Sequence, residues 1–147
     1  MLPLRVPDPD IVCARPFSSC NVLDWKGRFL LPKLICGGFA SQGGPPLLVC
    51  PMSIVGNWER EAARFAPGLR VHVHHGAERP KGKAFQLVVA SSDLVVTTYG
   101  LVIRDIDALR EMSWRRVVLD EAQAVKNAAT RAAVAVRSLP SPRRFAV

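Results

Sequence analysis

Two adjacent carboxylates, Asp120 and Glu121, directly follow the apolar run Val117–Leu119. Such a run is typical of a buried strand, and in open α/β sheets ligands bind at the carboxyl ends of the strands. One carboxylate there can hold Mg²⁺ while its neighbour orients or deprotonates a water that attacks a phosphate. The pattern predicts a phosphoryl-transfer site. The alternative interpretation is a strand that ends in two solvated acids.

Strands and helices that would position these carboxylates alternate from residue 47 onward. Apolar or alternating runs predict strands at 47–50, 70–74, 94–98, 116–120 and 144–147. Helical spacing of apolar residues predicts helices at 53–65, 80–91, 99–109 and 130–139, the first of them capped by Ser53. This alternation is typical of βαβ units. We therefore expect an α/β fold with a mainly parallel sheet and helices on both faces.

Residues 1–44 have a different character. Prolines interrupt every candidate helix, and the glycine- and proline-rich stretch at 37–46 is typical of a linker. The chain is therefore expected to divide into an irregular segment at 1–44, with one short helix at most, and an ordered domain at 45–147.

Three segments in a fixed order carry a family resemblance. Residues 51–58, from Pro-Met-Ser to a tryptophan, are similar to motif Ia of the Swi/Snf-type DNA translocases of helicase superfamily two. Thr97–Tyr99 resembles motif Ib, and Asp120–Gln123 (Asp-Glu-Ala-Gln) resembles motif II, the Walker B element. Lys126 and Asn127 continue the match, and residues 144–147 resemble the start of motif III. The resemblance covers about residues 45–147 and is strongest to the bacterial branch.

The resemblance implies an incomplete RecA-like lobe of the P-loop NTPase type, the N-terminal motor lobe of such an enzyme. In that family Asp120 would hold the Mg²⁺ of Mg-ATP through water and Glu121 would activate the attacking water. Gln123 would couple the nucleotide site to neighbouring motifs. The implied cofactors are therefore ATP and Mg²⁺.

The resemblance also implies a surface for the phosphate backbone of double-stranded DNA. Its residues would be Pro51, Met52, Ser53, Thr97, Thr98 and Tyr99. Hydroxyls and helix-start amides suit phosphates and carry no sequence information. Structural alternatives remain open at this point: Ser53 as a helix cap, the two threonines as ordinary strand-end residues, and Trp58 as a core side chain.

Two parts of a complete motor are missing from these 147 residues. No phosphate-binding loop, G-x-x-x-x-G-K-[ST], precedes motif Ia, and the nearest imitation, Gly76 with Gly82 and Lys83, is expected to be a surface turn. The second lobe is also absent, and a second chain could supply it. We therefore expect a fragment of a DNA-dependent ATPase that is not catalytically competent alone, which leaves its status as an enzyme open. A shifted reading frame, a rearrangement or a misplaced start would explain residues 1–44.

Composition supports a polyanionic partner. The chain carries 20 Lys and Arg against 12 Asp and Glu, a net charge of +8. The alternative function is therefore a non-catalytic basic module that binds nucleic acid. No apolar stretch approaches the roughly 18 residues of a membrane span, so no membrane partner is expected. The four cysteines form no C-x-x-C pair and predict reduced thiols. We expect a cytoplasmic protein, associated with the nucleoid if it is bacterial.

Overall fold

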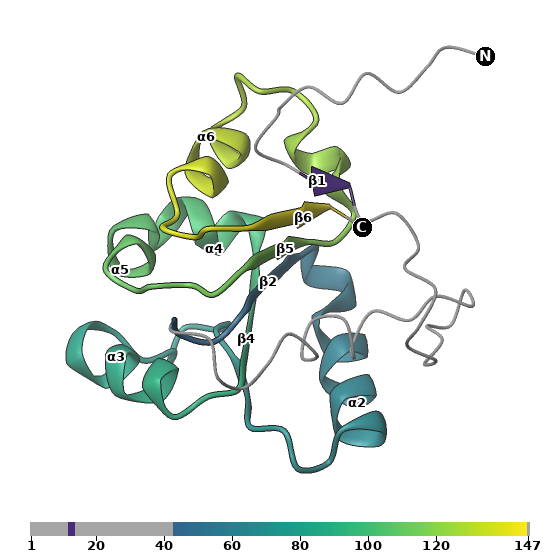
Figure 1. Cartoon of the computed structure of the whole chain (residues 1–147), viewed down its shortest axis with the longest axis vertical. Coiled ribbons are helices and arrows are strands. Elements are labelled where there is room, and N and C mark those ends of the chain that lie inside the picture. The colour runs from purple at the N-terminus through teal and green to yellow at the C-terminus, as the bar shows by residue number, and fades with distance from the viewer. Residues whose placement is uncertain (1–11, 14–42, 147) are drawn as a thin grey trace.

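A six-stranded parallel sheet organises the chain (Figure 1). The structure is a computed structural model that describes residues 12–13 and 43–146. The strands are β1 (Val12–Cys13), β2 (Leu47–Cys50), β3 (Val71–Val73), β4 (Leu94–Thr98), β5 (Val117–Leu119) and β6 (Arg144–Ala146). Their order across the sheet is β1-β6-β5-β2-β4-β3, and every neighbouring pair is parallel. The predicted α/β class and the five predicted strands are confirmed, and β1 is a strand that the sequence did not predict.

Alternation of side chains along the strands divides the core between the two faces of the sheet. Leu47 and Val49 of β2 belong to one buried cluster, whereas Leu48 and Cys50 belong to a second cluster. All four side chains are fully buried. Because successive residues of a strand point to opposite faces, a continuous apolar run such as β2 indicates a strand that is covered on both sides.

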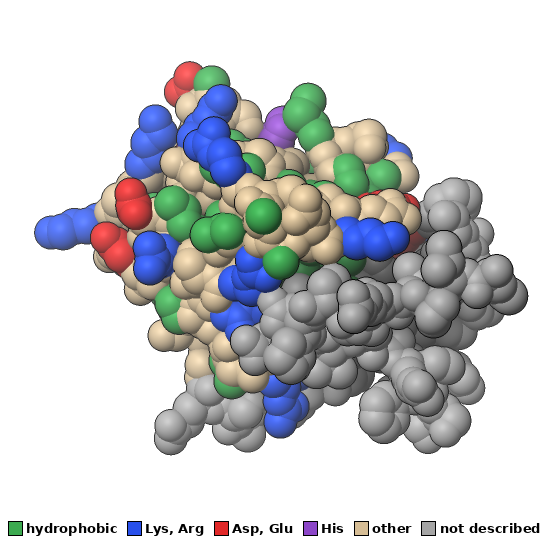
Figure 2. All heavy atoms as spheres, turned by 90° about the horizontal axis from the view of Figure 1, so that it is seen from above, with side chains coloured by type: hydrophobic (Ala, Val, Ile, Leu, Met, Phe, Trp, Pro, Cys, Tyr) green, Lys and Arg blue, Asp and Glu red, His purple; other side chains and the backbone are tan. Residues whose placement is uncertain are grey.

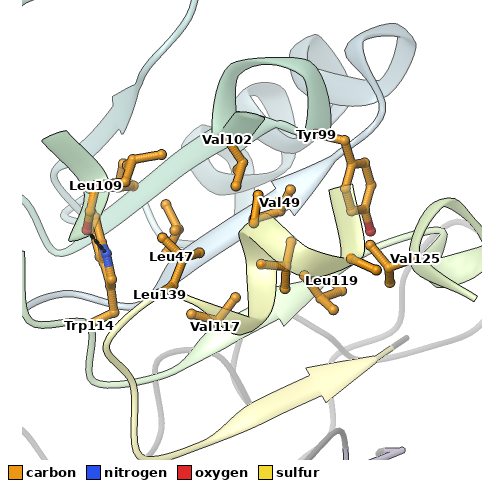
Figure 3. Close-up of a cluster of buried hydrophobic side chains, with 14 of the residues drawn as sticks. Leu47, Val49, Tyr99, Val102, Leu109, Trp114, Val117, Leu119, Val125 and Leu139 are labelled. Carbon is orange, nitrogen blue, oxygen red and sulfur yellow. Dashed lines mark hydrogen bonds between the residues drawn. The ribbon is translucent and has the colours of Figure 1, made fainter. Parts of the chain in front are cut away.

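Helices cover both faces, as predicted. The larger cluster, part of which is drawn in Figure 3, packs the sheet against α3 (Gly82–Ala90), α4 (Tyr99–Arg104), α5 (Ile106–Arg110), η2 (Ala122–Val125) and α6 (Arg131–Arg137). The smaller cluster packs the opposite face against α2 (Val55–Phe65), which follows the 3-10 turn η1 (Met52–Ile54). Trp58 and Ala62 of α2 are buried in this cluster, as their helical spacing predicted.

Two predicted helices differ from the structure. The helix expected at 99–109 is two helices, because the chain leaves helical geometry at Asp105, where φ is −107° and ψ is 24°. The carboxylate of Asp105 accepts hydrogen bonds from Arg79 and pairs with His74, and these distant partners hold the break in place. The predicted cap at Ser53 is wrong, because α2 begins at Val55 after η1 and neither element has a side-chain cap.

Three further expectations concern the N-terminal segment, the imitation of a phosphate loop and membrane-spanning helices. The predicted short helix within residues 1–44 lies outside the described residues, apart from β1. Gly76 and Gly82 both have positive φ, and Gly82 begins α3, so the imitation of a phosphate loop is a turn that runs into a helix. Among the residues that the structure describes, no helix has the length and apolar character needed to cross a membrane.

Candidate functional site

The Asp120 carboxylate lies at the carboxyl end of β5, in the middle of the sheet. The backbone N–H of Asp120 donates to the carbonyl of Val49 at 2.8 Å, so the ladder between β5 and β2 continues one residue beyond the strand. Since side chains alternate along a strand, Asp120 lies on the same face as Val118, which packs in the cluster with α2. The register of β5 therefore directs this carboxylate toward helix α2.

Both oxygens of Asp120 accept hydrogen bonds. The indole Nε1–H of Trp58 in α2 donates to Oδ2 at 2.7 Å. The backbone N–H of Glu121 donates to Oδ1 at 2.8 Å. On the other side of the chain, the hydroxyl of Tyr99 donates to the Asp120 carbonyl at 2.8 Å. Asp120 is thus held through its side chain and its backbone by residues from three different parts of the sequence.

Glu121 has an unusual backbone conformation. Its φ of 51° and ψ of 52° lie in the left-handed region, and no other non-glycine residue in the described part has a positive φ. This conformation costs an L-residue roughly 1–2 kcal/mol. It turns the chain sharply from β5 into η2, and the Glu121 side chain is exposed whereas Asp120 is half-buried. The two adjacent carboxylates therefore have different environments, which suits two different roles.

Two buried ionisable groups, the Cys50 thiol and the Tyr99 phenol, lie near the Asp120 carboxylate. Burial and the Asp120 carboxylate raise the pKa of the Cys50 thiol from its ordinary 9.0 to about 12. Burial first, and then the same carboxylate, raise the pKa of the Tyr99 phenol. Both groups stay protonated at neutral pH, and the thiolate that nucleophilic chemistry would require does not form. Cys50 is buried and forms no disulfide with any described residue.

The Asp120–Glu121 pair fits Mg²⁺ better than a cation that needs a full protein cage. In the described segments no group of three or more His, Cys, Asp or Glu side chains could hold a metal ion. Mg²⁺ is commonly bound by one or two carboxylates and completes its shell with waters and substrate phosphates. The pair offers hard oxygen donors, with Glu121 exposed to solvent and Asp120 partly so. These residues could hold Mg²⁺ together with a nucleotide.

The other residues of the motif II segment lie on the surface. Gln123 is exposed on η2, and Lys126 and Asn127 are exposed just after it. The side chain of Asn127 accepts a hydrogen bond from the N–H of Ala129 at 3.0 Å and so shapes the turn before α6. Lys126 and Asn127 therefore lie in the turn between η2 and α6.

The first predicted DNA-facing segment is exposed. Met52 is 70% exposed and Ser53 is also exposed, whereas Pro51 is half-buried. This segment follows the carboxyl end of β2, whose last residue, Cys50, pairs with Thr98 of β4. The sheet therefore brings the two predicted DNA-facing segments to the same edge.

The second predicted segment is buried, in contrast to the first. Thr97 is fully buried, and its hydroxyl donates to the carbonyl of His74 at 3.2 Å. Thr98 is 6% exposed and caps α4 by accepting the N–H of Leu101 at 3.3 Å. Tyr99 is 9% exposed, and its hydroxyl is bonded to Asp120. The hydroxyls of this segment are thus engaged within the fold, as the strand-end alternative described.

A second polar cluster lies beyond the end of β3. Asp105 joins His74 at 2.9 Å and Arg79 at 2.5 and 2.8 Å. The hydrogen bond from Arg79 is the main cause that lowers the pKa of Asp105, whereas burial lowers the pKa of His74. A cleft of about 240 Å³ lies beside the cluster, and Lys81 and Arg104 contribute to its lining. This cleft does not include Asp120 or Glu121.

Sequence reasoning considered Trp58 as a core side chain or as part of the DNA-facing segment, and missed its contact with Asp120. Trp58 is indeed buried, at 6% exposure, but its N–H also reaches Asp120. The two residues are 62 positions apart, so spacing alone could not pair them. The one available signal was the position of Trp58 at the end of the segment that resembles motif Ia.

Comparisons with known proteins agree with this arrangement. Residues 19–147 match the model of the SNF2-related domain. The chain is 44% identical over 98 residues to YwqA of Bacillus subtilis, and 33% identical over 146 residues to the DNA repair protein RAD5A of Arabidopsis thaliana. The aligned parts cover 67% and 92% of this chain but 11% and 13% of those relatives.

Solved structures give the same result. The SWI2/SNF2 ATPase core of Sulfolobus solfataricus in complex with double-stranded DNA matches 70% of this chain with a TM-score of 0.60 and 38% identity. The same core is also matched in a second structure, with a TM-score of 0.57 and 41% identity. In each case the match spans 20% of the solved chain. The predicted resemblance is confirmed, and the chain belongs to the SNF2-related domain family.

Proposed function

We propose that the chain forms part of a motor lobe that couples ATP hydrolysis to movement on duplex DNA. In this proposal Asp120 and Glu121 serve the nucleotide site, and the segment Pro51–Ser53 faces DNA. We further propose that these 147 residues bind duplex DNA but hydrolyse little or no ATP by themselves.

The observation that carries the proposal is the geometry of the two carboxylates. Asp120 is held at the end of a central strand by Trp58 and by the Glu121 N–H, whereas Glu121 turns away into solvent. A fixed carboxylate suits the binding of hydrated Mg²⁺, and a free one beside it suits the orientation of an attacking water. Bound Mg²⁺ would neutralise charge on the nucleotide phosphates.

Support for duplex DNA as the partner comes from charge and from exposed backbone. The net charge is +8, and Lys and Arg side chains outnumber acidic ones on the face shown in Figure 2. The exposed turn η1, at Met52–Ile54, follows β2 at the same edge of the sheet as Asp120. A solved relative, the Sulfolobus solfataricus core, is bound to double-stranded DNA. Contacts of this kind go to phosphates, so binding should fall steeply with salt.

The missing phosphate loop supports the lack of turnover. No G-K-[ST] sequence occurs anywhere in the chain. Without its lysine and backbone amides, the β- and γ-phosphates lose most of the groups that would hold them for attack. Asp120 and Glu121 would then act only beside groups that these 147 residues do not contain.

Nucleotide binding and turnover test the proposal together. Binding of a fluorescent ATP analogue should require Mg²⁺, be lost in Asp120→Ala and persist in Glu121→Gln. Phosphate release should stay at background in all three proteins. Turnover above background that disappears in Glu121→Gln would overturn the statement that the chain is inactive alone.

The second candidate function is a non-catalytic module that binds nucleic acid, which the charge of +8 favours. Duplex binding that falls with salt, but is unchanged by ATP and by Asp120→Ala, would support this module. Mg²⁺-dependent nucleotide binding distinguishes the two candidates, because a module of this kind has no use for the carboxylates.

A further inference from the structure

We propose that Trp58 is a positioning residue for the metal-binding carboxylate: its indole N–H holds Asp120 in the orientation that binds a divalent cation. The inference rests on the proposed function of Asp120. It goes further because it assigns a role in cation binding to a side chain of α2, the helix that packs on the face of the sheet toward which Asp120 points. The 2.7 Å bond from Nε1 to Oδ2 is the observation that carries it.

The indole ring is fixed by its surroundings. Trp58 is 6% exposed and packs in the cluster that contains Leu48 and Cys50 of β2 and Val118 of β5, the strand that Asp120 follows. A ring enclosed in a packed core has few alternative rotamers. The position of Nε1 is therefore determined by the sheet and by α2, and not by the turn after β5.

The hydrogen bond to Asp120 satisfies the buried indole N–H of Trp58. Indole Nε1–H is a donor only, and buried donors in folded proteins are nearly always paired. A bond to a carboxylate is charge-assisted and stronger than a bond between neutral groups. Because Trp58 occupies one oxygen and the Glu121 N–H the other, both partners restrict rotation of the Asp120 side chain. Partners of this kind, which hold a metal ligand from outside, commonly change metal affinity 10- to 100-fold when removed.

A second tryptophan provides an internal control. Trp114 is 1% exposed, and its Nε1–H donates to the backbone carbonyl of Leu109 at 2.8 Å. Figure 3 shows Trp114 and Tyr99 at opposite ends of the larger cluster, and Tyr99 is the one bonded to Asp120. Trp114 is therefore as buried as Trp58 and similarly bonded, but it lies away from the carboxylate.

Nuclear magnetic resonance of the indole N–H signals tests the inference on the full chain. The chain has three tryptophans, Trp25, Trp58 and Trp114, and therefore three indole N–H signals. Trp58→Phe and Trp114→Phe each remove one signal and so assign those two. MgCl₂ should shift the Trp58 signal, and trace MnCl₂, which is paramagnetic, should broaden it first. The Trp114 signal should respond to neither ion. Asp120→Asn should move the Trp58 signal without any metal, because the acceptor loses its charge.

Affinity for Mg²⁺ provides the second measurement. Trp58→Phe keeps an aromatic ring but lacks the N–H, and should weaken Mg²⁺ binding about tenfold or more. Trp114→Phe, which loses a comparable group, should bind as the unchanged protein does. Circular dichroism would show whether Trp58→Phe folds. If it does not fold, the inference is tested by two responses of the Trp58 indole signal: its shift with added metal in the unchanged protein, and its shift in Asp120→Asn.

The possible outcomes separate this inference from the proposed function. Cation binding that is lost in Asp120→Ala, but leaves the Trp58 signal and the affinity of Trp58→Phe unchanged, overturns the inference and preserves the proposed function. No cation-dependent change at any signal overturns both. A selective response at Trp58, with weaker binding in Trp58→Phe alone, supports both.

Discussion

Replacing Tyr99 by Phe removes one hydroxyl from the candidate site and leaves the ring in the core. In the structure this hydroxyl donates to the Asp120 carbonyl at 2.8 Å, and the residue is 9% exposed. A typical hydrogen bond contributes about 0.5–1.5 kcal/mol, and a buried acceptor left without its donor costs about 1–3 kcal/mol. We therefore expect Tyr99→Phe to lower the free energy of unfolding by about 1–2 kcal/mol.

Urea denaturation followed by circular dichroism measures this loss. Ser91→Ala is the control, because it removes an exposed hydroxyl that donates to a nearby carbonyl, and should change the free energy of unfolding by less than about 0.5 kcal/mol. Duplex DNA affinity is measured in parallel. If the Tyr99 hydroxyl served DNA, Tyr99→Phe would weaken DNA binding and leave stability unchanged. That result would refute the structural role that we assign to this hydroxyl.

Three further predictions concern the candidate site and the strands that support it. Burial raises the pKa of Tyr99, the sole tyrosine, above its ordinary 10.0. The protonated phenol therefore contributes its full share to stability below pH 10.0, and this contribution is lost as the pH rises further. Tyrosinate absorbance should appear only as alkali unfolds the chain. Gly44→Ala would place a Cβ 2.1 Å from the Ser113 carbonyl oxygen and should cost about 1–3 kcal/mol in urea melts, whereas Gly68→Ala, with nothing within 4 Å, should cost little. Glu121→Gly should raise the melting temperature by relieving left-handed strain, a gain of roughly 0.5–1 kcal/mol, and Glu121→Ala should give no such gain.

Local sequence was sufficient to predict the elements that position the site. The apolar run before Asp120 predicted β5, and the run at 47–50 predicted the neighbouring strand β2. Strands of this kind are recognised because a sheet covered on both faces needs apolar side chains at every position. The same patterns predicted the parallel α/β class, and three motifs in order indicated the family.

Elements that depend on distant partners were predicted less well. The expected helix at 99–109 breaks at Asp105 because that carboxylate is bonded to His74 and Arg79, which are 31 and 26 residues away. Ser53 has the right residue type for a cap, but the chain forms a 3-10 turn there and α2 begins two residues later. Propensity describes what a segment prefers alone, and tertiary contacts override that preference.

The candidate site also combines features set by local sequence with features set by tertiary contacts. The sequence by itself determined that two carboxylates follow a buried strand, and that Trp58 and Ala62 share an apolar helical face. The tertiary structure alone decided that Asp120 meets Trp58, that Tyr99 bonds to the Asp120 backbone, and that the hydroxyls of Thr97 and Thr98 are used within the fold. The physical reason is that periodicity specifies which face of an element is buried, whereas hydrogen bonds between side chains 62 residues apart depend on strand order and register, which only the packed sheet defines.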